Sequence, residues 1–382
     1  MKVLSQGKLP NEHLSSVAFG SGGFVAVGIG GRVLRSTDGR AWVPEYSGIT
    51  NALNAVAFAD RQYVAVGNQG SILRSSDGFF WVPATSGTTT NLNSVVRGSD
   101  NWLAVGDRGI ALTSSNAVTW TASNTGVTNQ LLQASFGAGR FIVAGGVLLS
   151  STNALNWFVI PQTNLPGSLS TSFKAATYGG ETFVAMAEVQ WPAYSVAYIL
   201  VSPDASDWTY VGIGYTHATA AQKLRFVGGL FAVFDNAMGV IDGSTVNGFE
   251  QSMNTSWDGF VWNVTGFWLS YGYEWSQQAS VDYGYQLQDN AFGNGIFVAV
   301  GRESLLRGVI SPAFTRAGVS NGGFTALLRG EPGVVYEIQT STNLANWDTL
   351  TNVSHSSGRI DVTNTTGLSP HRFYRARRQT EP

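Results

Sequence analysis

One pattern recurs along the chain at intervals of about 40 residues, and it constrains the fold more than any other feature of the sequence. Six serines each stand six residues before a tryptophan, with an Asp or Asn two residues after the serine. A run of alternating, often β-branched residues around a glycine-rich turn precedes each copy, as in SVAFGSGGFVAVG. Four short strands per copy at this period are typical of β-propeller blades, which cannot bury both faces alone. The pairs are Ser36 and Trp42, Ser75 and Trp81, Ser114 and Trp120, Ser151 and Trp157, Ser202 and Trp208, and Ser256 and Trp262.

A seventh copy, DNAFGNGIFVAVGRESLLRGVIS, begins near Asn290 and ends without its Ser-Asp-Trp element. The N-terminal KVLSQGKLPNEHLSSVAF aligns with WVPEYSGITNALNAVAF, so the chain starts at the fourth strand of a blade. We expect Lys2 to Gln6 to supply the outer strand that the last blade lacks, which removes two open sheet edges. The sequence therefore predicts an all-β protein with a seven-bladed β-propeller over residues 1–311, closed by an N-terminal strand.

The repeated SxDGxxW element favours a structural role. Its hydroxyl and carboxylate can bond backbone N–H groups of their own turn, and its glycine accepts positive φ. The Trp is then free to pack against neighbouring strands. Six copies of one turn are expected in a repeat protein, whereas six copies of one catalytic site are not.

This element resembles the Asp-box (BNR) repeat of sialidases, of secreted glycan-active propellers and of photosystem II stability and assembly-factor proteins. It departs from the common form, in which one residue separates the Asp from the Gly. In that family the box lies away from the catalytic face, so the resemblance implies a fold and not an activity. The arginine triad, Tyr–Glu pair and Asp of sialidases have no match that we can assign here.

Residues 312–382 have a different sequence pattern and are predicted to form a small β-sandwich. STNLANW, from Ser341 to Trp347, copies the turn from Ser151 to Trp157, so an eighth blade stays open as the alternative. The run VVYEIQTSTNLANW…FYRARR resembles a C-terminal module common in secreted proteins of the Verrucomicrobia and related bacteria. That resemblance implies an exported protein, secreted or held at the cell surface. The basic tail HRFYRARR could contact an acidic envelope component.

Loop lengths differ between the two faces of the predicted propeller. The offset from the end of the first strand to the start of the second is five residues in every copy except the sixth, where we count four. The second-to-third and blade-to-blade connections, which share the other face, are uniform in the first three copies and lengthen later. A uniform scaffold with long loops on one side is typical of folds that carry sites. We call this side the elaborated face and expect a ligand there, over the fifth to seventh copies.

The long loops of this face are rich in aromatic residues amid carboxylates and amides, a composition that suits a carbohydrate. Sugar rings stack on aromatic rings, and their hydroxyls bond carboxylates and amides. The alternative is that these side chains pack the loops against one another, although many exposed rings on one rim would form a costly patch. The candidate substrate-binding residues are Trp191, Tyr194, Trp268, Tyr271, Tyr273, Trp275, Tyr283, Tyr285 and Arg302.

Four loop carboxylates, Glu188, Asp235, Glu274 and Asp282, could act as acid and base for glycoside cleavage. His217, with a nearby Tyr, could serve a lyase that acts on uronic acids. Each of these residues also fits a plain solvated loop position. The sequence has no nucleophile elbow, P-loop or HExxH signature. No cofactor is predicted, although scattered loop carboxylates leave calcium binding open.

Composition excludes several partners. A net charge of −2 with 12% charged residues gives no reason to expect nucleic acid. No apolar run reaches the length that spans a membrane, and the start MKVLSQGKLP lacks an apolar signal core. The resulting hypothesis is an extracellular propeller that binds, or binds and cleaves, a polysaccharide or glycan. The alternative is a non-enzymatic scaffold or assembly factor that binds protein. An ester or lactone hydrolase is a weaker third reading, because no Ser-His arrangement is visible.

Overall fold

The structure is a computed structural model. It describes residues 2–161, 170–190, 195–210, 223–227, 230–237, 250–256, 263–268, 287–309, 313–320, 323–329, 333–354, 359–364 and 372–379. Within these ranges the chain is all-β, and the only helical elements are three 3-10 turns. These turns are η1 (Ile29–Gly31), η2 (Asn68–Gly70) and η3 (Asp107–Gly109).

The second to sixth repeats each form one antiparallel four-stranded sheet. The strands of the second and third repeats are β5 (Leu53–Ala59), β6 (Gln62–Gly67), β7 (Ile72–Ser75), β8 (Val82–Ala84), β9 (Leu92–Arg97), β10 (Trp102–Gly106), β11 (Ile110–Ser114) and β12 (Thr121–Asn124). Those of the fourth and fifth are β13 (Leu131–Gly137), β14 (Arg140–Gly145), β15 (Leu148–Ser151), β16 (Phe158–Val159), β17 (Ser170–Gly179), β18 (Thr182–Gln190), β19 (Ser195–Ser202) and β20 (Thr209–Tyr210). The sixth has β21 (Arg225–Val227), β22 (Leu230–Ala237), β23 (Glu250–Ser256) and β24 (Asn263–Trp268).

The first and seventh repeats share one six-stranded sheet of order β25-β26-β1-β2-β3-β4. The seventh repeat supplies β25 (Leu287–Gly293) and β26 (Ile296–Val309), and the first supplies β1 (Lys2–Gly20), β2 (Gly23–Gly28), β3 (Val33–Ser36) and β4 (Val43–Glu45). The N-terminal segment pairs with β26 as predicted, Lys2 opposite Val309 and Gln6 opposite Leu306.

The seventh repeat differs from expectation because β26 is one long strand where two short ones were predicted. In the first three repeats the chain turns after the second strand through a 3-10 turn. The last residue of each turn, Gly31, Gly70 or Gly109, has a φ of 66–71° that favours glycine. The corresponding GRES of the seventh repeat has no glycine after Gly301, and the strand continues.

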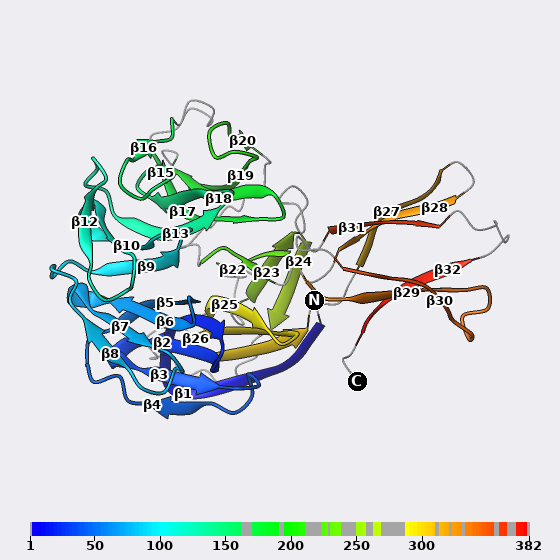
Figure 1. Cartoon of the computed structure of the whole chain (residues 1–382), viewed down its shortest axis with the longest axis horizontal. Coiled ribbons are helices and arrows are strands. Elements are labelled where there is room, and N and C mark those ends of the chain that lie inside the picture. Colours follow the sequence, from blue (N-terminus) through cyan, green and yellow to red (C-terminus); the bar gives the residue numbers. More distant parts are fainter. Residues whose placement is uncertain are drawn as a thin grey trace, which may run out of the picture.

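The first strands of the repeats lie around a common centre (Figure 1). They contact one another in the order β1, β5, β9, β13, β17, β21 and β25, and β25 in turn contacts β1. Apolar residues fill the space between neighbouring sheets; Val25 and Val27 of the first repeat, for example, cluster with Leu53 and Tyr63 of the second. The burial of these two-sided apolar strands holds the sheets together.

An aromatic pair joins the first two strands of a repeat at an offset of five residues. Ring centroids lie 4.8 Å apart for Phe19 and Phe24 and 4.9 Å apart for Phe226 and Phe231. The latter pair also faces across the ladder of β21 and β22. The count of four in the sixth repeat was therefore wrong, because Phe231 pairs with Phe226 and not with Val227, which pairs with Leu230.

The Ser-Asp turn makes the hydrogen bonds that the sequence predicted. In the first repeat Gly39 N donates to Ser36 Oγ at 2.9 Å, and Arg40 N donates to Asp38 Oδ1 at 2.8 Å. The Asp or Asn makes the same bonds in the next four repeats and in the turn from Ser341 to Trp347. The tryptophans of the first five repeats join the apolar clusters between sheets. The element therefore has a structural role: it is a hydrogen-bonded turn whose Trp packs between sheets.

The C-terminal residues form two three-stranded sheets, which lie to one side of the repeats in Figure 1. One sheet has the order β27-β28-β31, from β27 (Ala313–Ser320), β28 (Gly323–Arg329) and β31 (Arg359–Asn364). The other has the order β30-β29-β32, from β30 (Asp348–Val353), β29 (Tyr336–Ser341) and β32 (Phe373–Arg378). Leu328 and Val362 of the first sheet share one apolar cluster with Tyr336 and Ile338 of the second. Among the described residues, no helix has the length and apolar character needed to cross a membrane.

Candidate functional site

β-Bulges recur at one position in the first strands of the repeats. In each described case one extra residue stands between two residues that pair normally with the second strand. A bulge turns a side chain away from its usual direction and is common beside functional sites. The extra residues are Ser15, Asn54, Asn93, Leu132, Lys174 and Gln288.

Three of these bulge residues bind the side chain 14 positions later, at the end of the second strand. Asn54 Nδ2 donates to Asn68 Oδ1 at 2.9 Å, and Asn93 Nδ2 donates to Asp107 Oδ1 at 2.9 Å. In the fifth repeat the pair is ionic, with Lys174 Nζ 2.8 Å from Glu188 Oε2. We call these three pairs and the equivalent Gln288 and Arg302 the rim. Because the second-to-third connections begin at the rim, it lies on the elaborated face.

Asp107 shows the electrostatics of the rim. Burial raises its pKa, but hydrogen bonds from Asn93, Gln130 and Asn91 outweigh burial and hold the pKa below its ordinary value. Asn91 also accepts a bond from Gln69 N of the preceding repeat at 3.0 Å. The Asp107 carboxylate is thus ionised at neutral pH and fixed between repeats.

A largely buried ionic cluster, which we call the floor, lies against the bulges of the first two repeats. It is formed by Lys223, Leu224, Arg225 and Asp289. Arg225 binds Asp289 through two bonds of 2.9 and 2.8 Å, and Ser16 Oγ donates to the same carboxylate at 2.6 Å. Asp289 is fully buried. Paired and hydrogen-bonded charges of this kind tie elements together, because removal of one partner leaves a buried charge uncompensated.

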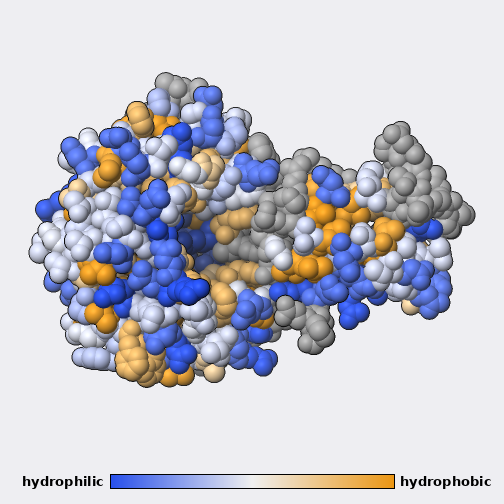
Figure 2. All heavy atoms as spheres, viewed as in Figure 1, coloured by the Kyte–Doolittle hydropathy of each residue, from blue (hydrophilic) through white to orange (hydrophobic). Residues whose placement is uncertain are grey.

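Lys223 and Leu224 reach across the centre. Lys223 Nζ donates to Asn54 O at 2.8 Å and to Ser15 O at 3.4 Å, carbonyls of two bulge residues. On the other side, Gln133 Nε2 donates to Leu224 O at 2.6 Å. The floor therefore contacts the first, second, fourth and seventh repeats from the start of the sixth. Figure 2 shows a hollow near the centre of the repeat sheets, bordered by hydrophilic residues on one side and by hydrophobic residues on the other.

Burial and ion pairing shift the pKa values of the charged floor residues in opposite directions. Burial and the positive charge of Arg225 together lower the pKa of Lys223 to about 8, against the attraction of Asp289. Burial raises the pKa of Asp289, but Arg225 and Lys223 outweigh burial and bring it to about 2. The cluster holds two basic groups and one carboxylate.

The structure places only part of the predicted site. Glu188 and Arg302 occupy the same repeat position on the rim, in the repeats that flank the sixth. Asp235 lies in β22 opposite Ser252, and Trp268 ends β24 opposite Glu250; for both, only the backbone is described. The remaining predicted residues lie outside the described residues, namely His217, Glu274, Asp282, Trp191, Tyr194, Tyr271, Tyr273, Trp275, Tyr283 and Tyr285.

Sequence reasoning missed most of the rim and the whole floor. The signal for the rim was present, since Asn54, Asn93 and Lys174 each precede a polar or charged residue by 14 positions. The floor left no such signal, because Lys223 and Asp289 are 66 positions apart and follow no repeat spacing.

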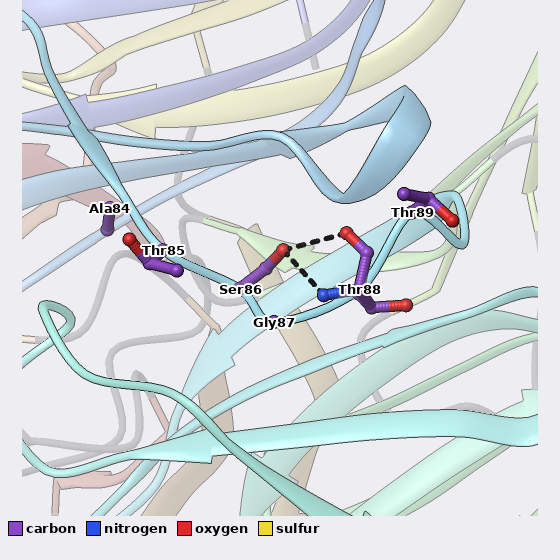
Figure 3. A pocket seen from close by; sticks show the side chains of 6 residues that line it. All are labelled: Ala84, Thr85, Ser86, Gly87, Thr88 and Thr89. Atoms are coloured by element: carbon purple, nitrogen blue, oxygen red, sulfur yellow. Dashed lines mark hydrogen bonds between the residues drawn. The ribbon is translucent and has the colours of Figure 1, made fainter.

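A surface pocket in the connection from β8 to β9 has a structural explanation. It is lined by Ala84 to Thr89, and Ser86 Oγ bonds Thr88 O at 3.1 Å and Thr88 N at 3.3 Å (Figure 3). Ser47 and Thr125 make the same bonds in the adjacent connections. The pocket is thus one copy of a repeated turn. No three acidic or histidine side chains in the described ranges lie close enough together to hold a metal ion.

Comparisons with solved structures show the fold. YCF48 from Cyanidioschyzon merolae matches 80% of this chain and 98% of its own, with 15% identity and a TM-score of 0.53. The WD40 β-propeller domain of Doa1 matches 80% of this chain and 95% of its own, with 11% identity and a TM-score of 0.52. The computationally designed Ika8 protein has a TM-score of 0.51 at 11% identity and covers 81% of this chain and 100% of its own. No family model matches the chain, and no curated protein does. The chain is an all-β protein with a β-propeller fold.

Proposed function

We propose that the chain is an extracellular carbohydrate-binding protein, secreted or held at the cell surface, which takes a polysaccharide on its elaborated face. In this proposal residues 1–311 form a seven-bladed Asp-box propeller closed by Lys2 to Gln6, and residues 312–382 form a small β-sandwich. The succession of first-strand contacts from β1 to β25 and back to β1 supports seven blades. The cluster shared by the two C-terminal sheets supports the sandwich.

The observation that carries the proposal is the polar rim. It sets amides, carboxylates and an ammonium group side by side at matching positions, each already oriented by a partner. A carbohydrate presents alternating hydroxyl donors and acceptors, and fixed amide and carboxylate groups can bond them without reorganising. We expect the aromatic residues predicted in the long connections of the fifth to seventh repeats to add stacking surfaces.

The described part of the rim favours binding over cleavage. Glycoside cleavage needs one protonated carboxyl group near a second carboxylate. Glu188 is instead paired with Lys174, and the pKa of Asp107 is held low. A catalytic version of the proposal would need its acid from Asp235, Glu274 or Asp282.

Binding is tested by isothermal calorimetry of the full chain against a panel of neutral and acidic polysaccharides. We expect at least one ligand, and we expect Trp268→Ala and Trp275→Ala each to weaken it tenfold or more. Phe158→Ala is the matched control, since it removes an aromatic ring that is 66% exposed on β16, away from the rim. A panel without any ligand, or equal losses in the control, would refute the proposal. Release of reducing ends from the bound ligand would show cleavage as well.

A second candidate, a protein-binding scaffold, is favoured by exposed rings on the outer side of the first two repeats. Tyr46 is 85% exposed, and Phe80 is 70% exposed beside Phe79. Exposed aromatic residues are enriched at protein interfaces. This candidate predicts a stoichiometric protein complex that Phe80→Ser disrupts and that polysaccharide leaves intact.

A further inference from the structure

The outer face of the sheet β30-β29-β32 carries a row of arginine and aromatic residues. Along β32, Phe373, Arg375 and Arg377 alternate with Tyr374 and Ala376, so they point to one side of the sheet. Ala376 packs into the apolar cluster between the two C-terminal sheets, which places the first three residues on the opposite, outer side. All three are exposed.

Arg375 is fixed on this face by two contacts. Its guanidinium carbon lies 4.1 Å from the ring centroid of Trp347, and its Nε donates to Gln339 Oε1 at 2.7 Å. Trp347 is itself held by a bond from its Nε1 to Leu344 O at 3.1 Å. A guanidinium stacked on a ring and bonded at one edge keeps its other donors in a fixed plane, which suits a planar carboxylate.

Arg377 adds a second positive charge along the same strand. Side chains two residues apart on a strand are about 7 Å apart, so the two arginines form a short linear array. Glu337 lies opposite Arg377 in the ladder. Because the face carries two arginines against this one glutamate, its net charge is positive. Exposed Asn352 adds an amide that can bond hydroxyls, whereas the Thr349 hydroxyl donates to Glu337.

Charge also distinguishes this part of the chain from the repeats. Residues 312–382 contain seven arginines and five acidic residues, whereas the whole chain has a net charge of −2. The C-terminal part is therefore positive, while the repeats are negative. An anionic polymer would be attracted to the former and repelled by the latter.

We propose that the outer face of β30-β29-β32 binds a carboxylated polysaccharide, with uronate carboxylates on Arg375 and Arg377 and a sugar ring on Phe373. This site is separate from the rim, and the inference does not depend on the proposed function of the repeats. A flat sheet face with a fixed guanidinium, an exposed ring and an amide group fits an extended sugar chain better than a compact ligand.

The test compares polygalacturonate with its fully methyl-esterified form, which has the same backbone without the charge. The full chain should bind polygalacturonate in calorimetry at 50 mM NaCl, bind the ester at least tenfold more weakly and lose most affinity at 500 mM NaCl. Arg377→Gln should weaken binding about tenfold, and Arg375→Lys should do so too, because lysine keeps the charge but loses the planar fork. The Arg375→Gln, Arg377→Gln double variant should bind none.

Arg40→Gln is the matched control, since Arg40 is an exposed arginine in the Ser-Asp turn of the first repeat. It should bind as the unaltered chain does. The far-ultraviolet circular dichroism spectrum of each variant should match that of the unaltered chain. A loss of binding can then not be attributed to misfolding. Equal binding of the ester, an equal loss in Arg40→Gln, or equal binding of anionic phospholipid vesicles would overturn the proposal.

Discussion

Replacement of Asn290 by valine should stabilise the protein. Asn290 is 1% exposed, and among the described residues neither its side-chain nitrogen nor its side-chain oxygen has a hydrogen-bond partner. Its backbone N donates to Asp289 Oδ1, a bond that any side chain would preserve. The equivalent residues of the first three repeats are Val17, Val56 and Val95, each buried between sheets.

The expected gain follows from the cost of the unpaired amide. A buried polar group without a partner costs about 1–3 kcal/mol, and valine removes that cost while adding apolar contact. We expect the free energy of unfolding to rise by about 2 kcal/mol. With an unfolding entropy of about 2.1 cal/mol/K per residue, this corresponds to about 3 °C in Tm for a unit of roughly 310 residues.

The assay is urea denaturation followed by tryptophan fluorescence, with the midpoint compared at unchanged slope. Asn54→Val is the matched control, because this amide bonds Asn68 Oδ1 and Leu92 O, both at 2.9 Å. It should lower stability by about 1–2 kcal/mol. A lower midpoint for Asn290→Val would show that the amide has a partner in solution and would refute the reasoning.

Three further predictions concern the floor and a strained turn. Asp289→Asn leaves Arg225 and Lys223 without their carboxylate and should cost about 3–5 kcal/mol, measured by the same denaturation assay. Burial lowers the pKa of Lys223 to about 8, so between pH 8 and 10.5 the unfolded chain binds more protons at this group than the folded chain. The stability of the unaltered chain relative to Lys223→Met should therefore rise with pH across that window, and a flat difference would contradict the burial. Leu344 is 57% exposed with a φ of 62°, so Leu344→Gly should relieve about 1 kcal/mol of strain and raise the melting transition of the C-terminal sheets.

The repeat period allowed much of the fold to be predicted from the sequence. Alternating apolar residues and a Ser-to-Trp spacing of six predict the strand order, the register and the Ser-Asp turn, because these are local properties repeated many times. The pairing of Lys2 with Val309 was also accessible, since the alignment of the N-terminus with a fourth strand is a sequence property. The continuous β26 was not expected, because it depends on the absence of a glycine turn in a single copy.

Less of the candidate site could be predicted from the sequence. Glu188 was singled out as a catalytic carboxylate, but its ion pair with Lys174 depends on a bulge that one sequence does not reveal. Asp289 was not singled out, although it is fully buried beside Arg225 and Ser16. Contacts between distant repeats depend on how the repeats pack together, and hydrophobic periodicity carries no information about them.

The most direct test of a ligand-binding elaborated face is hydrogen–deuterium exchange of the full chain with and without its tightest polysaccharide. Our account predicts slower exchange in the bulges at Asn54, Asn93 and Lys174 and in the turns that follow Asn68 and Glu188. Exchange in the Ser-Asp turns at Asp38 and Asp77 should stay the same. Protection of those turns with no change at the bulges would contradict the account.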